Sequence, residues 1–282
     1  MASSPPLILL PPSEGKAPGG SGEPWCPGTL HAPELDPGRV KVGSALKAAM
    51  RATIAARTKL LGVKGDALGA ASETNRLVAS APTMEAIRRY TGVLYGELAY
   101  DRLSGRLQRR VDGQVRILSA LWGVVAPTDL IPDYKLKMGA SLPRIGRLAP
   151  WWRPQLSAVL DAEAEGRTVW NLLPNEHAAA WVPQVSGVGL PVRVITVRFL
   201  DETPDPTAGP RATKLVGVNH WNKLLKGALV RHILAEQLSE PAGLTEFLSP
   251  HRYEYRPDLT VVRPDGTIAT CLVKQRGIAA RG

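Results

Sequence analysis

The hydrophobic positions of the chain fall into short continuous runs, which predict buried strands, and into longer segments of mixed character. The continuous runs lie at 7–10 (LILL), 115–127, 168–177 and 192–200. The run VRVITVRFL at 192–200 gives the clearest strand pattern. A hairpin is predicted near the end of the chain, where TVV and TIATCLV flank the turn RPDG.

Two segments have apolar residues at helical spacing. In 40–61, Leu46, Met50 and Ile54 fall at i, i+4 and i+8, which predicts one helix with a buried stripe. The segment 218–238 predicts a second helix, with Leu225, Leu229 and Ile233 on its buried side. The Gly- and Pro-rich stretches 17–38 and 201–212 are expected to be surface loops.

Strands that alternate with helices predict an α/β fold of mixed α+β type, with a central mixed sheet. With 282 residues, 44% of them hydrophobic, the chain is long enough for one large domain or two small ones. The net charge of +10 indicates an anionic partner, either nucleic acid or a phosphorylated ligand. The alternative is a surface charge that only keeps the protein soluble.

The positive charge is clustered along the chain. Between residues 39 and 76 there are eight basic residues and two acidic ones, Asp66 and Glu73. The stretch 135–153 has five basic residues and no acidic one, and Lys214, Lys223, Lys226 and Arg231 form a third group. Each cluster is either an anion-binding surface or a solvated helix face.

The segment LLGVKGDALGAA at 60–71 joins two helical patterns through a turn bounded by glycines. It resembles the turn of a helix-hairpin-helix element, in which glycines let the backbone approach DNA phosphates. We therefore predict a helix-hairpin-helix-like region at 40–77, with DNA-contacting residues Arg51, Lys59, Gly62, Lys64 and Gly65. The alternative is an ordinary turn between helices with a glycine C-cap.

The first predicted strand opens directly onto PPSEGKAPGG. A P-loop is excluded, because it needs a glycine where the chain has Leu10 and a Ser or Thr where it has Ala17. Lys16 is therefore expected near the end of a strand, where ligands of α/β sheets bind.

Polar residues also follow the other predicted strands. The residues expected at strand ends or just beyond them are Lys16, Ser119, Asp133, Tyr134, Lys137, Asn171 and Glu176. Together they predict a polar pocket in which Glu176, beside His177, acts as a general acid or base and lysines hold an anion. Each residue also has a structural alternative: Glu176 as a helix cap, Asn171 at a strand end, and Tyr134 packed with its hydroxyl at the surface.

Metal binding is not predicted, since the five histidines show no ligand spacing, and we expect no cofactor. Cys26 and Cys271 lie far apart and have no partner motif. The N-terminal stretch lacks the features of a signal peptide, and no window is apolar enough to span a membrane. We expect a cytoplasmic protein.

Five motifs together carry a resemblance to a known family: LLPPSEGKAPGG, YTGVLYGEL, ILSALWGVVAPTDLIPDYKLKMG, NLLPNEH and HWNKLLKGALVRHIL. In this order and spacing the sequence is similar to the YaaA family of bacterial peroxide stress proteins. The central motif is the most specific. Its matching residues are Ser119, Trp122, Gly123, Asp129, Tyr134, Lys135, Met138 and Gly139.

The resemblance implies a single α/β domain over 1–282 with a positively charged cleft and a helix-hairpin-helix element. It also implies DNA binding and a role in lowering free iron and protecting DNA from oxidative damage. Because no base-reading helix is evident in the sequence, we expect the binding to have little sequence preference. Carried over by position, the residues that would line the cleft and bind its ligand are Lys16, Lys135, Lys137, Lys223 and Lys226.

Two functions are thus expected from the sequence. The first is binding of the DNA phosphate backbone during the peroxide stress response. The alternative is an enzyme that acts on a nucleotide-like or phosphorylated small molecule, with Glu176, Lys16 and Tyr134 as its catalytic residues. Direct ligation of iron is disfavoured by the histidine spacing.

Overall fold

The computed structural model of the protein describes residues 4–183, 192–205, 207–208, 212–218 and 222–274. Its strands are β1 (Leu7–Leu10), β2 (Met84–Glu85), β3 (Val115–Ser119), β4 (Gly123–Val125), β5 (Leu130–Ile131), β6 (Ser141–Leu142), β7 (Gly146–Arg147), β8 (Thr168–Asn171), β9 (Arg193–Pro204), β10 (Thr213–Gly217), β11 (Glu254–Tyr255), β12 (Val261–Val262) and β13 (Ile268–Lys274). Its α-helices are α1 (Asp36–Ala49), α2 (Ile54–Leu61), α3 (Gly65–Leu77), α4 (Ala86–Arg89), α5 (Val93–Leu98), α6 (Gly105–Gln114), α7 (Leu148–Ala164), α8 (Asn175–Ala178) and α9 (Asn222–Glu236). Short 3-10 helices lie at Pro33–Leu35, Tyr100–Arg102, Pro241–Glu246, Pro250–Arg252 and Pro257–Leu259.

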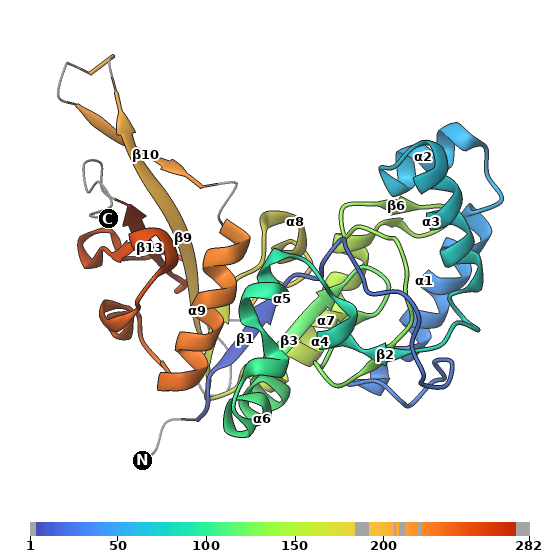
Figure 1. Ribbon diagram of the computed structural model, residues 1–282, viewed down its shortest axis with the longest axis horizontal. Coiled ribbons are helices and arrows are strands. Elements are labelled where there is room, and N and C mark those ends of the chain that lie inside the picture. The colour runs from blue at the N-terminus through green and yellow to red at the C-terminus, as the bar shows by residue number, and fades with distance from the viewer. Residues whose placement is uncertain (1–3, 184–191, 206, 209–211, 219–221, 275–282) are drawn as a thin grey trace.

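A mixed sheet forms the centre of the fold, as the sequence predicted (Figure 1). Nine strands of the described chain pair in the order β11-β13-β9-β8-β1-β3-β4, with β10 added beside β9 and β12 beside β13. The strands β3, β1, β8, β9 and β13 run parallel to their neighbours, whereas β4, β10, β11 and β12 are antiparallel additions. The predicted strands at β1, β3, β8 and β9 and the hairpin of β12 with β13 are confirmed.

The strand order creates a topological switch point between β1 and β8. After β1 the chain first adds β3 on one side, and later adds β8, β9 and β13 on the other. The connections that leave β1 and β8 at their carboxyl ends therefore diverge. In open parallel sheets this is the place where a crevice forms and ligands bind.

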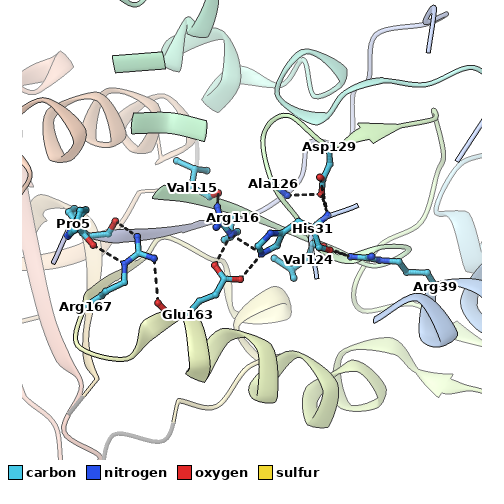
Figure 2. Close-up of polar contacts among 11 residues, drawn as sticks. Pro5, His31, Arg39, Val115, Arg116, Val124, Ala126, Asp129, Glu163 and Arg167 are labelled. Atoms are coloured by element: carbon cyan, nitrogen blue, oxygen red, sulfur yellow. Dashed lines mark hydrogen bonds and ion pairs between the residues drawn. The ribbon is translucent and has the colours of Figure 1, made fainter. Parts of the chain in front are cut away.

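The core lies on both faces of the central strands. All four residues of β1 are fully buried, which explains why this strand is a continuous apolar run and does not alternate. Helices α5, α6 and α9 cover one face, and α7 covers the other (Figures 1 and 2). The ring of Trp152 in α7 is buried and donates its indole N–H to Ala120 O at 2.9 Å. No helix in the described part of the chain is long and apolar enough to cross a bilayer.

The helix predicted over 40–61 is two helices, so that prediction was wrong in its extent. Helix α1 begins earlier, at Asp36, and ends at Ala49, and α2 begins at Ile54. Thr53 has an extended ψ of 158°, and its hydroxyl caps α2 by accepting from Ala56 N at 3.3 Å. Because the chain changes direction there, Leu46 is buried as expected but Ile54 is 68% exposed.

The sequence predicted a surface loop over 201–212, but part of this stretch belongs to a strand. Strand β9 continues through Pro204, and β10 begins at Thr213 and pairs with it in antiparallel register, Thr213 opposite Pro204. The two strands extend away from the body of the protein (Figure 1). Residues 206 and 209–211 of this stretch, and residues 219–221 of the helix predicted over 218–238, lie outside the described chain.

A buried polar network joins the N-terminal segment to the sheet and to α7 (Figure 2). Arg116 of β3 donates from Nε to Glu163 Oε2 of α7 at 2.7 Å, and His31 Nε2 lies 2.6 Å from Glu163 Oε1. Burial tends to raise the pKa of Glu163, but its contacts with His31 and Arg116 outweigh burial and hold that pKa below the ordinary value. Asp129 accepts from the backbone N–H of His31 and of Ala126.

Arg39 completes this network from α1. It is 1% exposed and donates to Asp36 Oδ1 at 2.7 Å and to the carbonyl oxygens of His31, Trp122 and Val124 at 2.6, 2.9 and 2.9 Å. These bonds fix α1 against the β3–β4 turn. Sequence patterns did not reveal the network, because its members are separated by up to 132 positions.

Candidate functional site

A cavity of about 110 Å³ lies beside the switch point, where the segments that follow β1 and β8 come together. Its lining comes from the segment after β1, the segment 135–137, and α8. The lining residues are Pro12, Ser13, Glu14, Lys16, Lys135, Leu136, Lys137, Glu176 and His177. The structure thus brings together Lys16, Lys137 and Glu176 of the residues predicted from strand ends, and Lys135, which only the family resemblance had predicted.

Lys16 is a partly buried cation of this cavity. Its Nζ donates to Ser13 O at 3.1 Å and lies 4.2 Å from the centre of the Tyr134 ring, a cation–π contact. Burial lowers the pKa of Lys16 to about 8; the charge of Asp133 opposes this shift and that of Lys135 adds to it. A substantial fraction of the amine is therefore neutral slightly above neutral pH.

Tyr134 packs against Lys16 and contacts Ser119 in turn, but neither Tyr134 nor Ser119 lines the cavity. The Tyr134 hydroxyl is 2.7 Å from Ser119 Oγ and 2.9 Å from the hydroxyl of Tyr90, and Tyr134 is only 2% exposed. Burial raises the pKa of Tyr134 to about 12, so the phenol stays protonated. The suggestion that its hydroxyl lies at the surface was wrong. Ser119 is fully buried and also accepts from Trp122 N at 3.1 Å.

Glu14 occupies the space between the two outer lysines. Its carboxylate lies 3.2 Å from Lys135 Nζ and 3.4 Å from Lys137 Nζ, and its side chain is 63% exposed. Partial burial favours the protonated form, but the two lysines outweigh this and lower the pKa of Glu14. The two ammonium groups are thus arranged around one anionic group, which in this structure belongs to the protein itself.

Helix α8 places Glu176 and His177 on the other wall. Glu176 Oε1 accepts from the backbone N–H of Gly139, so it does not cap its own helix. Both ring nitrogens of His177 are buried and have no hydrogen-bond partner. Burial, opposed by the charge of Glu176, lowers the pKa of His177 to about 4, so the imidazole is neutral at physiological pH.

The other predicted ligand residues do not line this cavity. Asn171 accepts from Leu173 N at 3.1 Å, the strand-end role that was its structural alternative. Lys226 donates to Leu172 O at 2.9 Å, and burial lowers its pKa to about 8. Lys223 is exposed on α9, and Asp133 influences Lys16 only through its charge.

A second cationic region lies on the turn between α2 and α3. Gly62 ends α2 in the left-handed conformation, with φ of 69°, and donates to Thr58 O at 2.9 Å. Lys59, in the last turn of α2, and Lys64, just before α3, are exposed beside it, whereas Arg51 is exposed ahead of α2, at the other end of that helix. Within the described chain none of the three forms an ion pair. The glycine C-cap that the sequence offered as an alternative is therefore present.

The helical turn and the cavity are neighbours. A Cβ atom placed on Gly62 would lie 3.3 Å from Lys137 Nζ, so this lysine borders both regions. The Asn75 side chain of α3 also accepts from Lys135 N and donates to Lys135 O, both at 2.9 Å. These bonds fasten the helix pair to the segment that carries the cavity lysines.

The three basic clusters are not gathered around one concavity. Lys214 lies on β10, at the opposite end of the molecule from α2 (Figure 1). Arg231 is paired with Glu97 at 2.6 Å, and Arg153 donates to Ala179 O at 2.9 Å. Of the clustered cations, Lys135 and Lys137 line the cavity, and Lys59 and Lys64 lie beside the α2–α3 turn.

Within the described residues there is no group of three or more His, Cys, Asp or Glu side chains that could hold a metal ion. His220, one of the five histidines, lies outside those residues.

Fold and site together define a mixed α/β protein with a lysine-lined cavity at the switch point of its sheet. The chain belongs to the YaaA family: the family model described as peroxide stress protein YaaA matches residues 7–259. A UPF0246 protein of Streptomyces coelicolor is 35% identical over 250 residues, which cover 88% of this chain and 91% of the relative. A UPF0246 protein of Corynebacterium glutamicum strain R is 40% identical over 244 residues, covering 85% and 88% of the two chains. The predicted family is confirmed.

Proposed function

We propose that this YaaA family member binds duplex DNA through the phosphate backbone, at the surface formed by the α2–α3 turn and the residues around it. The observation that carries the proposal is the pair of exposed cations without ion-pair partners, Lys59 and Lys64, on either side of the turn at Gly62, with Arg51 exposed at the other end of α2. Each such cation that meets a phosphate releases a condensed counterion, which makes binding favourable and dependent on salt.

The start of α3 supports the same surface. Lys64 occupies its N-cap position, and no side chain caps the helix, so the N–H groups of its first turn remain available to an anion. Asp66 in that first turn opposes an approaching phosphate. The surrounding cations outnumber this one carboxylate, and they favour contacts to the backbone over contacts to base edges. We therefore expect little sequence preference.

Bound protein would contribute to protecting DNA during peroxide stress. An indirect effect on iron agrees with the histidine spacing of the sequence. Under this proposal the protein covers the backbone and does not sequester the metal itself.

The test is duplex affinity, measured by fluorescence anisotropy at low salt. Lys59→Ala and Lys64→Ala should each weaken binding while leaving thermal stability unchanged, because both side chains are exposed. Lys214→Ala is the matched control, since it removes an equal charge from the far end of the molecule. Equal weakening by all three variants would show a general charge effect and contradict the proposed surface.

A second candidate is a small anionic ligand in the lysine-lined cavity. The convergence of Lys16, Lys135 and Lys137 with Glu176 and an unpartnered His177 favours it, because a protein that only binds DNA backbone does not need an acid next to a partly buried imidazole. Nucleotides and sugar phosphates should then raise the melting temperature; a ligand at 100 times its dissociation constant adds about 2.7 kcal/mol. Lys16→Ala or Glu176→Gln should remove this stabilisation, and a screen without any stabilising anion would argue against the pocket.

A further inference from the structure

Lys16 has the surroundings that turn a lysine into a nucleophile. Two features activate a lysine amine: burial away from water and the proximity of other cations. Lys16 has both, since it is packed on the Tyr134 ring with Lys135 and Arg89 close enough to disfavour its charge. Glu14 and Asp133 act in the opposite direction, but neither forms an ion pair with it in the described structure. The amine therefore lies in the cavity without a carboxylate that would lock it as ammonium.

The same cavity has a position for an anion. The Glu14 carboxylate, 3.2 Å from Lys135 Nζ and 3.4 Å from Lys137 Nζ, marks the place where a phosphate oxygen would lie. Because the Glu14 side chain is 63% exposed, it can swing into solvent when a more highly charged group arrives. A phosphate at this position brings the rest of its molecule into a cavity that also contains the Lys16 amine.

We propose that the Lys16 amine forms an imine with an aldehyde on a molecule whose phosphate displaces Glu14 from Lys135 and Lys137. The inference rests on the second candidate function and names its ligand class and chemistry. The amine nitrogen adds to the aldehyde carbon to give a carbinolamine, the carbinolamine loses water, and a carbon–nitrogen double bond remains. The products are one imine and one water molecule, and no oxidant or reductant takes part.

The proton balance of this step needs no further residue. The neutral amine loses both of its protons, and with the aldehyde oxygen they make up the water molecule that is released. Both ring nitrogens of His177 are buried and Glu176 accepts from the Gly139 N–H, so neither residue is assigned a proton in this step.

Two sources offer an aldehyde beside a phosphate: a free aldose phosphate, and the ring-opened deoxyribose of an abasic site in DNA. The second is suggested by the position of Lys137, which borders both the cavity and the turn at Gly62. DNA held at that turn would present its backbone next to the cavity. The experiment separates the two sources.

Reductive trapping tests the inference on the full-length protein. Sodium cyanoborohydride converts an imine into a stable secondary amine, which peptide mass spectrometry can locate. One arm uses glyceraldehyde 3-phosphate, with unphosphorylated glyceraldehyde as its control; the other uses a duplex with one abasic site, with the intact duplex as its control. Lys226 serves as an internal comparison, because burial lowers its pKa to about 8 as well, yet it lies outside the cavity lining.

In at least one arm, the amount of adduct on Lys16 should exceed that on Lys226 by about tenfold or more, because of these two lysines only Lys16 shares a cavity with a phosphate position. Trapping in the first arm alone identifies a free sugar phosphate, and trapping in the second identifies abasic DNA. Lys16→Arg keeps the positive charge and should remove the adduct. Equal labelling of Lys16 and Lys226, equal trapping of glyceraldehyde with and without its phosphate, or no adduct in either arm would overturn the inference.

Failure of the inference is distinguishable from failure of the proposed functions. If glyceraldehyde 3-phosphate raises the melting temperature but gives no adduct, the proposed anion pocket stands and only the imine chemistry is removed. If the intact duplex binds with the predicted dependence on Lys59 and Lys64, but the duplex with an abasic site gives no adduct, the proposed DNA-binding surface stands and only the imine chemistry is removed.

Discussion

Replacing the buried Arg39 by methionine tests whether the polar network in Figure 2 holds α1, and with it the helical turn, in place. Methionine keeps most of the side-chain volume but none of the four hydrogen bonds. Asp36, with a side chain 10% exposed, would then keep only the 2.6 Å bond from Gly28 N. Removing one partner of a buried ion pair costs about 3–5 kcal/mol, because the other charge stays buried.

Arg88→Met is the matched control for this experiment. Arg88 also forms ion pairs, with Glu85 and Asp101, but its side chain is 44% exposed, and exposed pairs are worth about 0–1 kcal/mol. Urea unfolding followed by circular dichroism gives both free energies, provided that the slope with urea is unchanged. Losses of equal size in the two variants would refute the role assigned to Arg39.

Two further predictions concern the cavity. Glu14→Gln removes the internal anion from between Lys135 and Lys137, so the affinity for inorganic phosphate in isothermal titration calorimetry should rise. The rise should be no more than about fivefold, because an exposed pair contributes at most about 1 kcal/mol. Unchanged or weaker binding would contradict the account of Glu14. The pKa of His177 is lowered to about 4, so between the ordinary value of about 6.5 and this one the unfolded chain takes up a proton that the folded protein does not. Stability is therefore lost as the pH falls through this window. Between pH 6.5 and about 4.5 the wild type should lose about 2 kcal/mol more than His177→Gln in urea unfolding, and parallel losses would show that His177 is not buried as neutral imidazole.

Much of the fold and part of the site followed from patterns in the sequence. The fully apolar run at Leu7–Leu10 predicted a strand buried on both faces, and the rule that ligands bind at strand ends placed Lys16 and Glu176 at one site. The strand is confirmed because its pattern lies within four consecutive residues. Lys16 and Glu176 line one cavity because the strands that precede them, β1 and β8, are neighbours in the sheet.

The rest depended on contacts between distant segments. Helical spacing carried the predicted helix through Met50 to Ile54, although Thr53 supplied a helix cap that periodicity alone does not weigh. Lys226 lies on α9 and donates from its amine to the Leu172 carbonyl. The direction of this side chain depends on how α9 packs, which the sequence pattern does not show. The role of Gly139 in holding Glu176 joins positions 37 residues apart.

The most direct test of the central claim, that the α2–α3 turn binds DNA phosphates, is the dependence of duplex affinity on salt. The logarithm of the association constant should fall linearly with the logarithm of salt concentration, with a slope of about −0.9 for each phosphate contact. The double variant Lys59→Ala, Lys64→Ala should make that slope less steep by about 1.8, whereas Lys214→Ala should leave it unchanged. A double variant with the wild-type slope would show that these lysines meet no phosphate and would contradict the account.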